Sequence, residues 1–173
     1  MIAYHCDSNA VLDVPFKSRV DRHHLIAYNT IIQRLKDRKL IVDLQILDNE
    51  TSKVYKQTIT SDWDIHFQLV PPHIHHRNAD KRAIGTFNTH FLSILAGVAE
   101  DFPKHCWDLL LPQAELTLNL LCQSQVQPMI SAYGCMHGPF DYNATPLGPL
   151  GCAVIIHKKN AQRHTWDFRG HEG

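Results

Sequence analysis

The chain has 173 residues, enough for one domain with an appendage and for a hydrophobic core. Lys plus Arg and Asp plus Glu each number 17, so no net charge favours a nucleic acid or a membrane surface as partner. The sequence shows neither a signal peptide nor the roughly 20 apolar residues of a membrane span. Five cysteines without a C-x-x-C pair predict reduced, mostly buried thiols in an intracellular protein.

The N-terminal part predicts a hairpin followed by a helix. Two β-prone runs, residues 1–6 and 11–17, flank turn-type residues that include Asp7. Asp7 follows an apolar strand, but Asp-Ser-Asn is turn chemistry, so we assign it to the turn. Ser18 begins an S-x-x-D pattern resembling a capping box, and apolar residues at helical spacing continue from it to Leu35.

The middle of the sequence alternates between strand and helix patterns. The apolar run 40–47 predicts a strand buried on both faces, residues 51–60 a short helix, and residues 65–70 the next strand. Long helices are expected from Asn78 and after Pro103. The side chains expected to face inward are Ile84, Phe87, Phe91 and Leu95 on the first, and Trp107, Leu110, Ala114, Leu118 and Leu121 on the second.

After Cys122 the composition changes to Gly, Pro and Asn, and residues 152–157 predict a lone strand before a polar tail. The whole order argues for an α/β fold in which helices flank a mixed sheet. A ribonuclease H-like fold has five strands, the first three antiparallel, with helices between the later ones. The predicted strands supply its second to fifth, so we expect a ribonuclease H-like sheet whose first strand is missing.

Three features of the sequence are candidates for chemistry. Asp48 ends the apolar run 40–47, where open α/β sheets place ligands, although Asp48-Asn49-Glu50 is also a common turn pattern. His73, His75 and His76 suit either a metal site or a Pro-rich surface loop.

The third candidate is the start of the helix after Asn78. Asn78 is a good N-cap, yet the position three residues later holds Lys81, where a capping box has Glu or Gln. A cation there also faces the positive end of the helix dipole. His76, Arg77, Lys81 and Arg82 together form a modest patch for phosphate groups.

Three ordered blocks carry a family resemblance. "LQILDNE", "QLVPPHIHHRNADKRAIGTF" and "FPKHCWDLLLPQAELTLNLL" resemble the integrase of copia-type retrotransposon polyproteins. "TPLGPLGCAVIIH" looks like the start of the segment that follows the integrase core. The resemblance therefore implies a truncated catalytic core at residues 1–122 and a post-core Gly/Pro-rich segment at 123–173.

The family is a DDE polynucleotidyl transferase in which two aspartates and a glutamate hold two Mg²⁺ ions. By this resemblance Asp48 is the second aspartate, a catalytic residue and metal ligand, and Lys81 stands at the position of the glutamate. The first aspartate is expected upstream of Met1 and is absent. Asp80 beside Lys81 is a poor substitute, because it points about 100° around the helix.

The resemblance thus implies an inactive remnant of a retrotransposon integrase that does not bind Mg²⁺ productively. It also implies DNA as a partner and a nuclear location, and it leaves a homo-oligomer open. The alternative is a non-enzymatic nucleic-acid-binding or interaction protein derived from the element.

Overall fold

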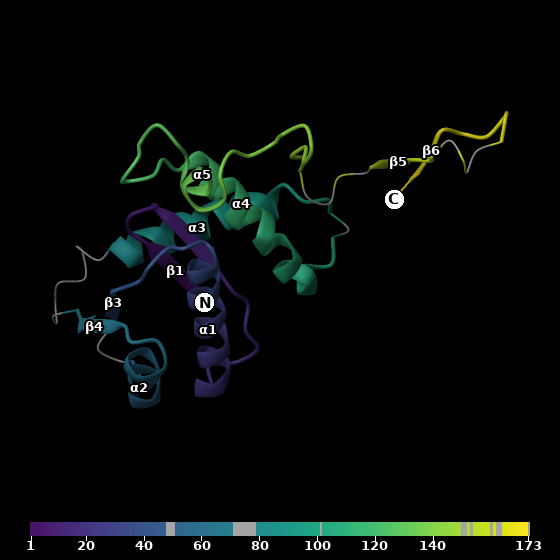
Figure 1. Ribbon diagram of the computed structural model, residues 1–173. Helices are drawn as coiled ribbons and strands as arrows, with labels where there is room; N and C mark the ends of the chain where they lie inside the picture. The colour runs from purple at the N-terminus through teal and green to yellow at the C-terminus, as the bar shows by residue number, and fades with distance from the viewer. Residues whose placement is uncertain are drawn as a thin grey trace.

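The computed structural model describes residues 1–47, 51–70, 79–100, 102–149, 152, 154–159, 161 and 164–172. These residues form a mixed α/β structure, as the sequence predicts, with five α-helices and three separate two-stranded sheets (Figure 1). A single mixed sheet was expected, but the described strands pair only two by two.

The N-terminal hairpin confirms the sequence prediction. Strand β1 (Ile2–His5) pairs antiparallel with β2 (Ala10–Asp13), and every residue of β2 is buried. Asp7 lies in the connecting turn, where its carbonyl oxygen accepts bonds from the backbone N–H groups of Gln125 and Val126. The turn role predicted for Asp7 is therefore confirmed.

Helix α1 (Asp21–Asp37) buries one apolar face that includes Tyr28, Ile31 and Leu35. The predicted capping role of Ser18 is wrong, because the helix begins three residues later and Val20 is its N-cap without a side-chain bond. The Ser18 hydroxyl is instead bonded to the His23 imidazole, at 2.8 Å from Nδ1.

The second pair of strands is parallel. Strand β3 (Leu44–Leu47) pairs with β4 (His66–Leu69), and helix α2 (Lys53–Asp62) connects them and packs on β4 and on α1. The prediction that this strand is buried on both faces is wrong, since the side chains of Leu44 and Ile46 are 53% and 45% exposed.

Helices α3 (Ala79–Ala96) and α4 (Leu111–Leu121) pack against the hairpin. Helix α3 contacts β1, and helix α4, which follows the 3₁₀-helix η2 (Lys104–Leu110), contacts β2. The inward positions predicted on η2 and α4 are buried at Leu110, Ala114 and Leu118. Trp107 and Leu121 are exposed instead. Cys106 has non-helical backbone angles, so helical spacing does not hold through η2.

The hairpin lies between two groups of buried side chains because its side chains alternate in direction. Ala10 and Leu12 belong to the core that contains α1, α2, Leu47 of β3 and helix α5 (Ala132–His137). Val11 belongs to the second core, with α3 and α4. Helix α5 was not expected, and its Ala132 and Met136 bring residues beyond 122 into the main core.

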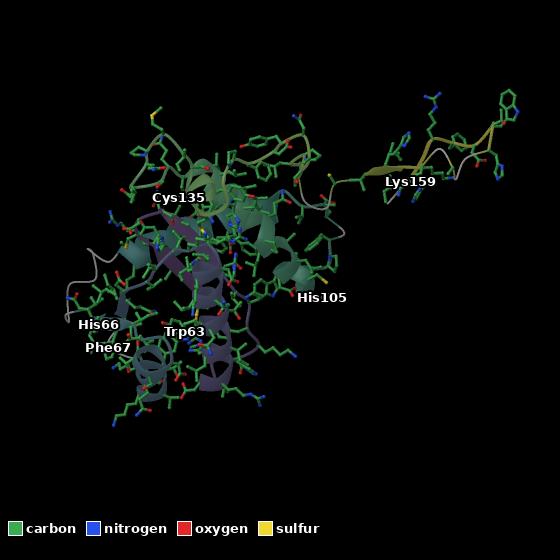
Figure 2. The ribbon with its side chains drawn as sticks, in the orientation of Figure 1. Trp63, His66, Phe67, His105, Cys135 and Lys159 are labelled. Carbon is green, nitrogen blue, oxygen red and sulfur yellow. The ribbon has the colours of Figure 1, made fainter. Side chains whose placement is uncertain are left out.

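The C-terminal strands form a hairpin of their own. Strand β5 (Ile155–His157) pairs antiparallel with β6 (Gly170–Glu172), so the expectation of a lone strand is wrong. Figure 1 shows this hairpin extending away from the helices. Figure 2 shows Lys159 on it, far from Trp63, His66 and Cys135. We call the described residues from Val154 to Glu172 the C-terminal arm.

None of the five cysteines forms a disulfide. The prediction of mostly buried thiols is wrong, because Cys6 and Cys152 are exposed and the other three are half-buried. In the described part of the chain, no helix combines the length and the apolar character needed to cross a membrane.

Candidate functional site

The sheet edge expected to carry catalytic groups is the carboxyl end of β3 and β4. The two strands are parallel with Leu47 opposite Leu69, and the Val70 N–H donates to the Leu47 carbonyl at 2.9 Å. Both strands therefore end at the same edge. Asp48, the predicted catalytic residue and metal ligand, follows Leu47 directly but lies outside the described residues.

The start of α3 is the second part of this expected site. Lys81 and Arg82 lie in its first turn and both are exposed. The other members of the predicted phosphate patch, His76 and Arg77, lie outside the described residues, as do His73, His75 and the predicted cap Asn78. The structure thus places Lys81 and Arg82 in the exposed first turn of α3 and does not test the roles predicted for the site residues.

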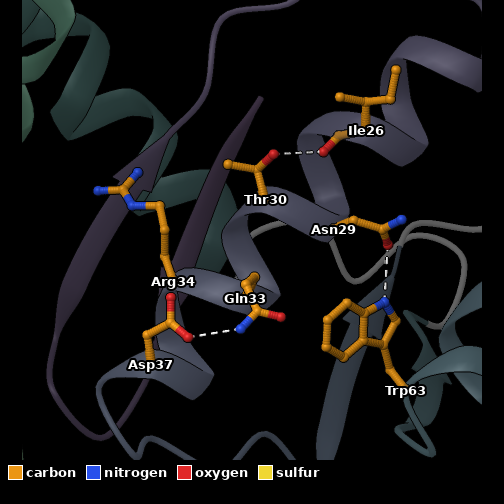
Figure 3. Close-up of a pocket in the computed structure, with 7 residues that line it drawn as sticks. All are labelled: Ile26, Asn29, Thr30, Gln33, Arg34, Asp37 and Trp63. Atoms are coloured by element: carbon orange, nitrogen blue, oxygen red, sulfur yellow. Dashed lines mark hydrogen bonds between the residues drawn. The ribbon is translucent and has the colours of Figure 1, made fainter.

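A groove of about 530 Å³ lies along the exposed side of α1, against Trp63 (Figure 3). Its polar groups are bonded to one another. The Trp63 indole N–H donates to Asn29 Oδ1 at 2.9 Å, and Gln33 Nε2 donates to Asp37 Oδ1 at 2.7 Å. The Lys36 ammonium lies 5.8 Å from the centroid of the Trp63 ring, within range of a cation–π contact. These contacts join α1 to the residues after α2.

A partly buried group of charged side chains joins β2, α1 and α4. The Asp13 N–H donates to Glu115 Oε2 at 2.8 Å, and Arg34 forms an ion pair with the same carboxylate. Arg34 Nη1 also donates to the Asp13 carbonyl at 3.1 Å. In Figure 3 the Arg34 guanidinium points away from Trp63. Three elements that are distant in sequence therefore share one electrostatic contact.

Burial and the neighbouring Glu115 carboxylate raise the pKa of Asp13 from 3.8 to about 7, against the opposing effects of Arg34 and the terminal ammonium. A hydrogen bond between the Asp13 and Glu115 side chains contributes to the same rise in pKa. Two carboxyl groups this close share a proton more easily than they both ionise. The Asp13 side chain thus holds a proton at pH values where an exposed aspartate is charged.

A cavity of about 290 Å³ lies beside Asp13, at the open end of the hairpin. We call it the aromatic pocket. The side chains that line it include Asp13, Phe16, Phe87, Asn88, Phe91 and Trp107. The rings of Phe87 and Phe91 are stacked, with centroids 6.3 Å apart. The Trp107 ring meets Phe91 edge-on at 6.3 Å. The pocket therefore has aromatic walls and one carboxyl side chain.

Sequence reasoning missed both the charge group and the pocket. One signal was present: α4 is apolar apart from a few polar residues, and Glu115 and Asn119 are spaced four apart on it. Residues at this spacing share one helix face, and here that face is turned toward β2. The partners Asp13 and Arg34 lie 102 and 81 residues from Glu115, so no local pattern identifies them.

Within the residues described, no group of three or more His, Cys, Asp or Glu side chains is arranged to hold a metal ion. No protein-family model matches the chain, and a search of curated proteins finds no match.

Proposed function

We propose that the chain is an integrase-derived protein of the copia type, with a ribonuclease H-like core that no longer transfers DNA strands. Mg²⁺ is the metal of the family, and in this chain the site does not bind it productively. DNA is the partner implied by the same resemblance.

The observation that carries the proposal is the parallel pairing of β3 and β4. Both strands end at one sheet edge. Asp48 directly follows one strand, and the segment leading to α3 directly follows the other. The distance along the chain from Leu69 to the first turn of α3 is short. This order, a strand, an acidic residue, a parallel strand and a helix, is the order in which the family presents its second and third carboxylates.

The two strand pairs also suit a larger sheet. The hairpin and the β3–β4 pair pack against the same core and α1, with Leu12 and Leu47 in one cluster. One further strand between them would join an antiparallel and a parallel pair into a five-stranded mixed sheet. That is the arrangement we propose for the parent fold.

Lys81 is the reason for proposing inactivity. Its exposed side chain lies in the first turn of α3, where the resemblance has the metal-binding glutamate. An ammonium in place of a carboxylate removes a hard oxygen ligand and repels a divalent cation.

The proposal is tested by restoring the carboxylate. We expect Lys81→Glu to raise the affinity for Mn²⁺, a spectroscopic substitute for Mg²⁺, by about tenfold or more, because the resemblance implies that a glutamate here and Asp48 bind the same metal ions. Arg82→Glu is the matched control: it makes the same change of charge about 100° around the helix. Asp48→Ala in the Lys81→Glu background should abolish the gain.

Equal gains from Lys81→Glu and Arg82→Glu would contradict the alignment with the integrase family. In a parallel assay, the unmodified chain should not nick duplex DNA with Mg²⁺. Nicking that disappears in Asp48→Ala would contradict the proposed inactivity.

A second candidate is a non-enzymatic nucleic-acid-binding protein, favoured by the adjacent exposed cations Lys81 and Arg82. Gel-shift titrations across a salt series distinguish it. Replacing both residues by Ala should flatten the logarithmic salt dependence by about one to two units, since each phosphate contact contributes roughly 0.9.

A further inference from the structure

Two regions of the described chain are rich in aromatic side chains: the C-terminal arm and the aromatic pocket. The C-terminal arm carries Trp166 and Phe168, whose side chains are 96% and 87% exposed. Ile155 on the same arm is 79% exposed. Several large apolar side chains exposed to water on one segment are typical of a surface that binds a protein partner. The described large apolar side chains of the arm are therefore all exposed, and those of Trp166 and Phe168 almost completely.

The aromatic pocket has the opposite property, since it is an apolar cavity walled by Phe16, Phe87, Phe91 and Trp107. Aromatic rings favour stacked or edge-to-face neighbours with centroids about 4.5–7 Å apart. Phe91 and Trp107 already form such a pair at the wall, and a further ring can extend the array.

Charge also distinguishes the two regions. Residues 152–173 contain four Lys or Arg against two Asp or Glu, whereas residues 1–151 contain thirteen against fifteen. The chain as a whole has no net charge, but its C-terminal residues are basic and the rest of the chain is acidic. Burial and Glu115 raise the pKa of Asp13, the one carboxyl side chain that lines the pocket, to about 7, so the acidic balance comes from the residues around the pocket, such as Asp108 next to Trp107. The terminal ammonium of Met1 also lines the pocket, but it donates to the Val14 carbonyl.

We propose that the arm of one molecule inserts Trp166 and Phe168 into the aromatic pocket of a second copy of this chain. The arm extends away from the helices that form the pocket, so the contact joins different molecules (Figure 1). The pairing is heterologous: each copy offers one arm and one pocket, and the contact can repeat from copy to copy. This inference does not depend on the proposed relation to integrases.

The proposed contact is small. Two aromatic side chains bury about 150–250 Å² each, so the interface lies at the small end of specific protein contacts. We therefore expect reversible association with a Kd in the micromolar range. The net positive charge of residues 152–173 and the net negative charge of residues 1–151 favour the encounter of two molecules and make it sensitive to salt.

The experiment measures the mass of the full chain by sedimentation velocity and light scattering over a concentration series. The arm variant carries Trp166→Ser and Phe168→Ser, and the pocket variant carries Asn88→Trp. Asn88 is exposed and lines the pocket, so a tryptophan there fills the pocket without removing a core side chain. The matched controls are Tyr142→Ser, an exposed aromatic outside the arm, and Thr89→Trp, the neighbouring exposed position outside the pocket lining.

The unmodified chain should associate as its concentration rises, and both controls should behave like it. Each of the two variants should weaken association by about tenfold or more. An equimolar mixture of the two variants keeps one intact arm and one intact pocket, so it should form heterodimers and nothing larger. Circular dichroism verifies that each variant is folded.

Three results would overturn the proposal. The first is an unmodified chain that stays monomeric throughout the series. The second is an arm variant that associates as strongly as the unmodified chain. The third is a mixture of folded variants that remains monomeric although the unmodified chain associates.

Discussion

The hairpin β1–β2 and the parallel pair β3–β4 are both two-stranded sheets of four-residue strands, yet they are covered very differently. All four residues of β2 are buried. In the other pair, Leu47 is the one buried residue, and Leu44, Ile46 and Leu69 expose large apolar side chains. Two strands alone are marginally stable in water, so the surroundings of each pair decide its stability.

The outer edge of β2 shows how a strand is covered without a neighbouring strand. Asn119 accepts from the Val11 N–H at 2.9 Å and donates back to the Val11 carbonyl at 2.8 Å. Glu115 accepts from the Asp13 N–H, and Arg34 donates to the Asp13 carbonyl. Helix side chains thus supply the bonds that another strand would make, and they close an edge that would otherwise promote aggregation.

The largest expected effect comes from opening that edge. Asn119→Leu removes both partners of Val11, and both residues are buried, at 3% and 4% exposure. Each unpaired buried backbone group costs about 1–3 kcal/mol, so we expect a loss of about 2–6 kcal/mol in the free energy of unfolding. Urea denaturation measures it. Asn88→Leu, at an exposed helix position, should change stability by less than about 0.5 kcal/mol.

A pair of matched truncations compares the two sheets directly. Leu12 of β2 is fully buried, whereas Leu44 of β3 is 53% exposed. Leu12→Ala should lower the free energy of unfolding by about 2–5 kcal/mol, because it leaves a cavity. Leu44→Ala should lower it by less than about 1 kcal/mol, because little buried apolar area is lost. Thermal or urea unfolding of both variants measures the two losses in unfolding free energy. Equal losses would mean that the β3–β4 pair is as well covered as the hairpin.

Much of the order of elements could be predicted from local sequence, because periodicity and turn residues act over a few residues. The hairpin, the helix between β3 and β4 and the parallel strands themselves follow from such patterns. Apolar runs do not reveal which face will be covered, which explains the error at Leu44 and Ile46. Burial there depends on tertiary neighbours rather than on the run itself.

The candidate sites also differ in whether a local sequence pattern can identify them. Asp48 and Lys81 were identified from short motifs, and the described residues test neither role. The Asp13–Glu115 contact and the aromatic pocket depend on segments about 100 residues apart, so they follow only from the folded chain. Polar residues spaced four apart in an apolar helix, as at Glu115 and Asn119, were the one local sign that such a contact exists.

The smallest of the three effects concerns the pH dependence of the covered edge. An unfolded Asp13 loses its proton near pH 4, whereas in the folded chain its pKa is about 7. Between these values the folded state holds a proton that the unfolded state lacks, so stability falls as pH rises from about 4 to 7. We expect Asp13 to contribute a loss on the order of 2 kcal/mol, because coupling to Glu115 divides the shift in pKa between the two groups.

Asp13→Asn removes this titration and keeps a side chain that can donate to Glu115. The difference in unfolding free energy between the variant and the unmodified chain, measured by urea titration at pH 5 and pH 8, isolates the effect from other groups that titrate. The variant should gain relative to the unmodified chain at pH 8 compared with pH 5. A difference that is the same at both pH values would mean that the edge of β2 is held by Asn119 and Glu115 alone, without a shared proton at Asp13.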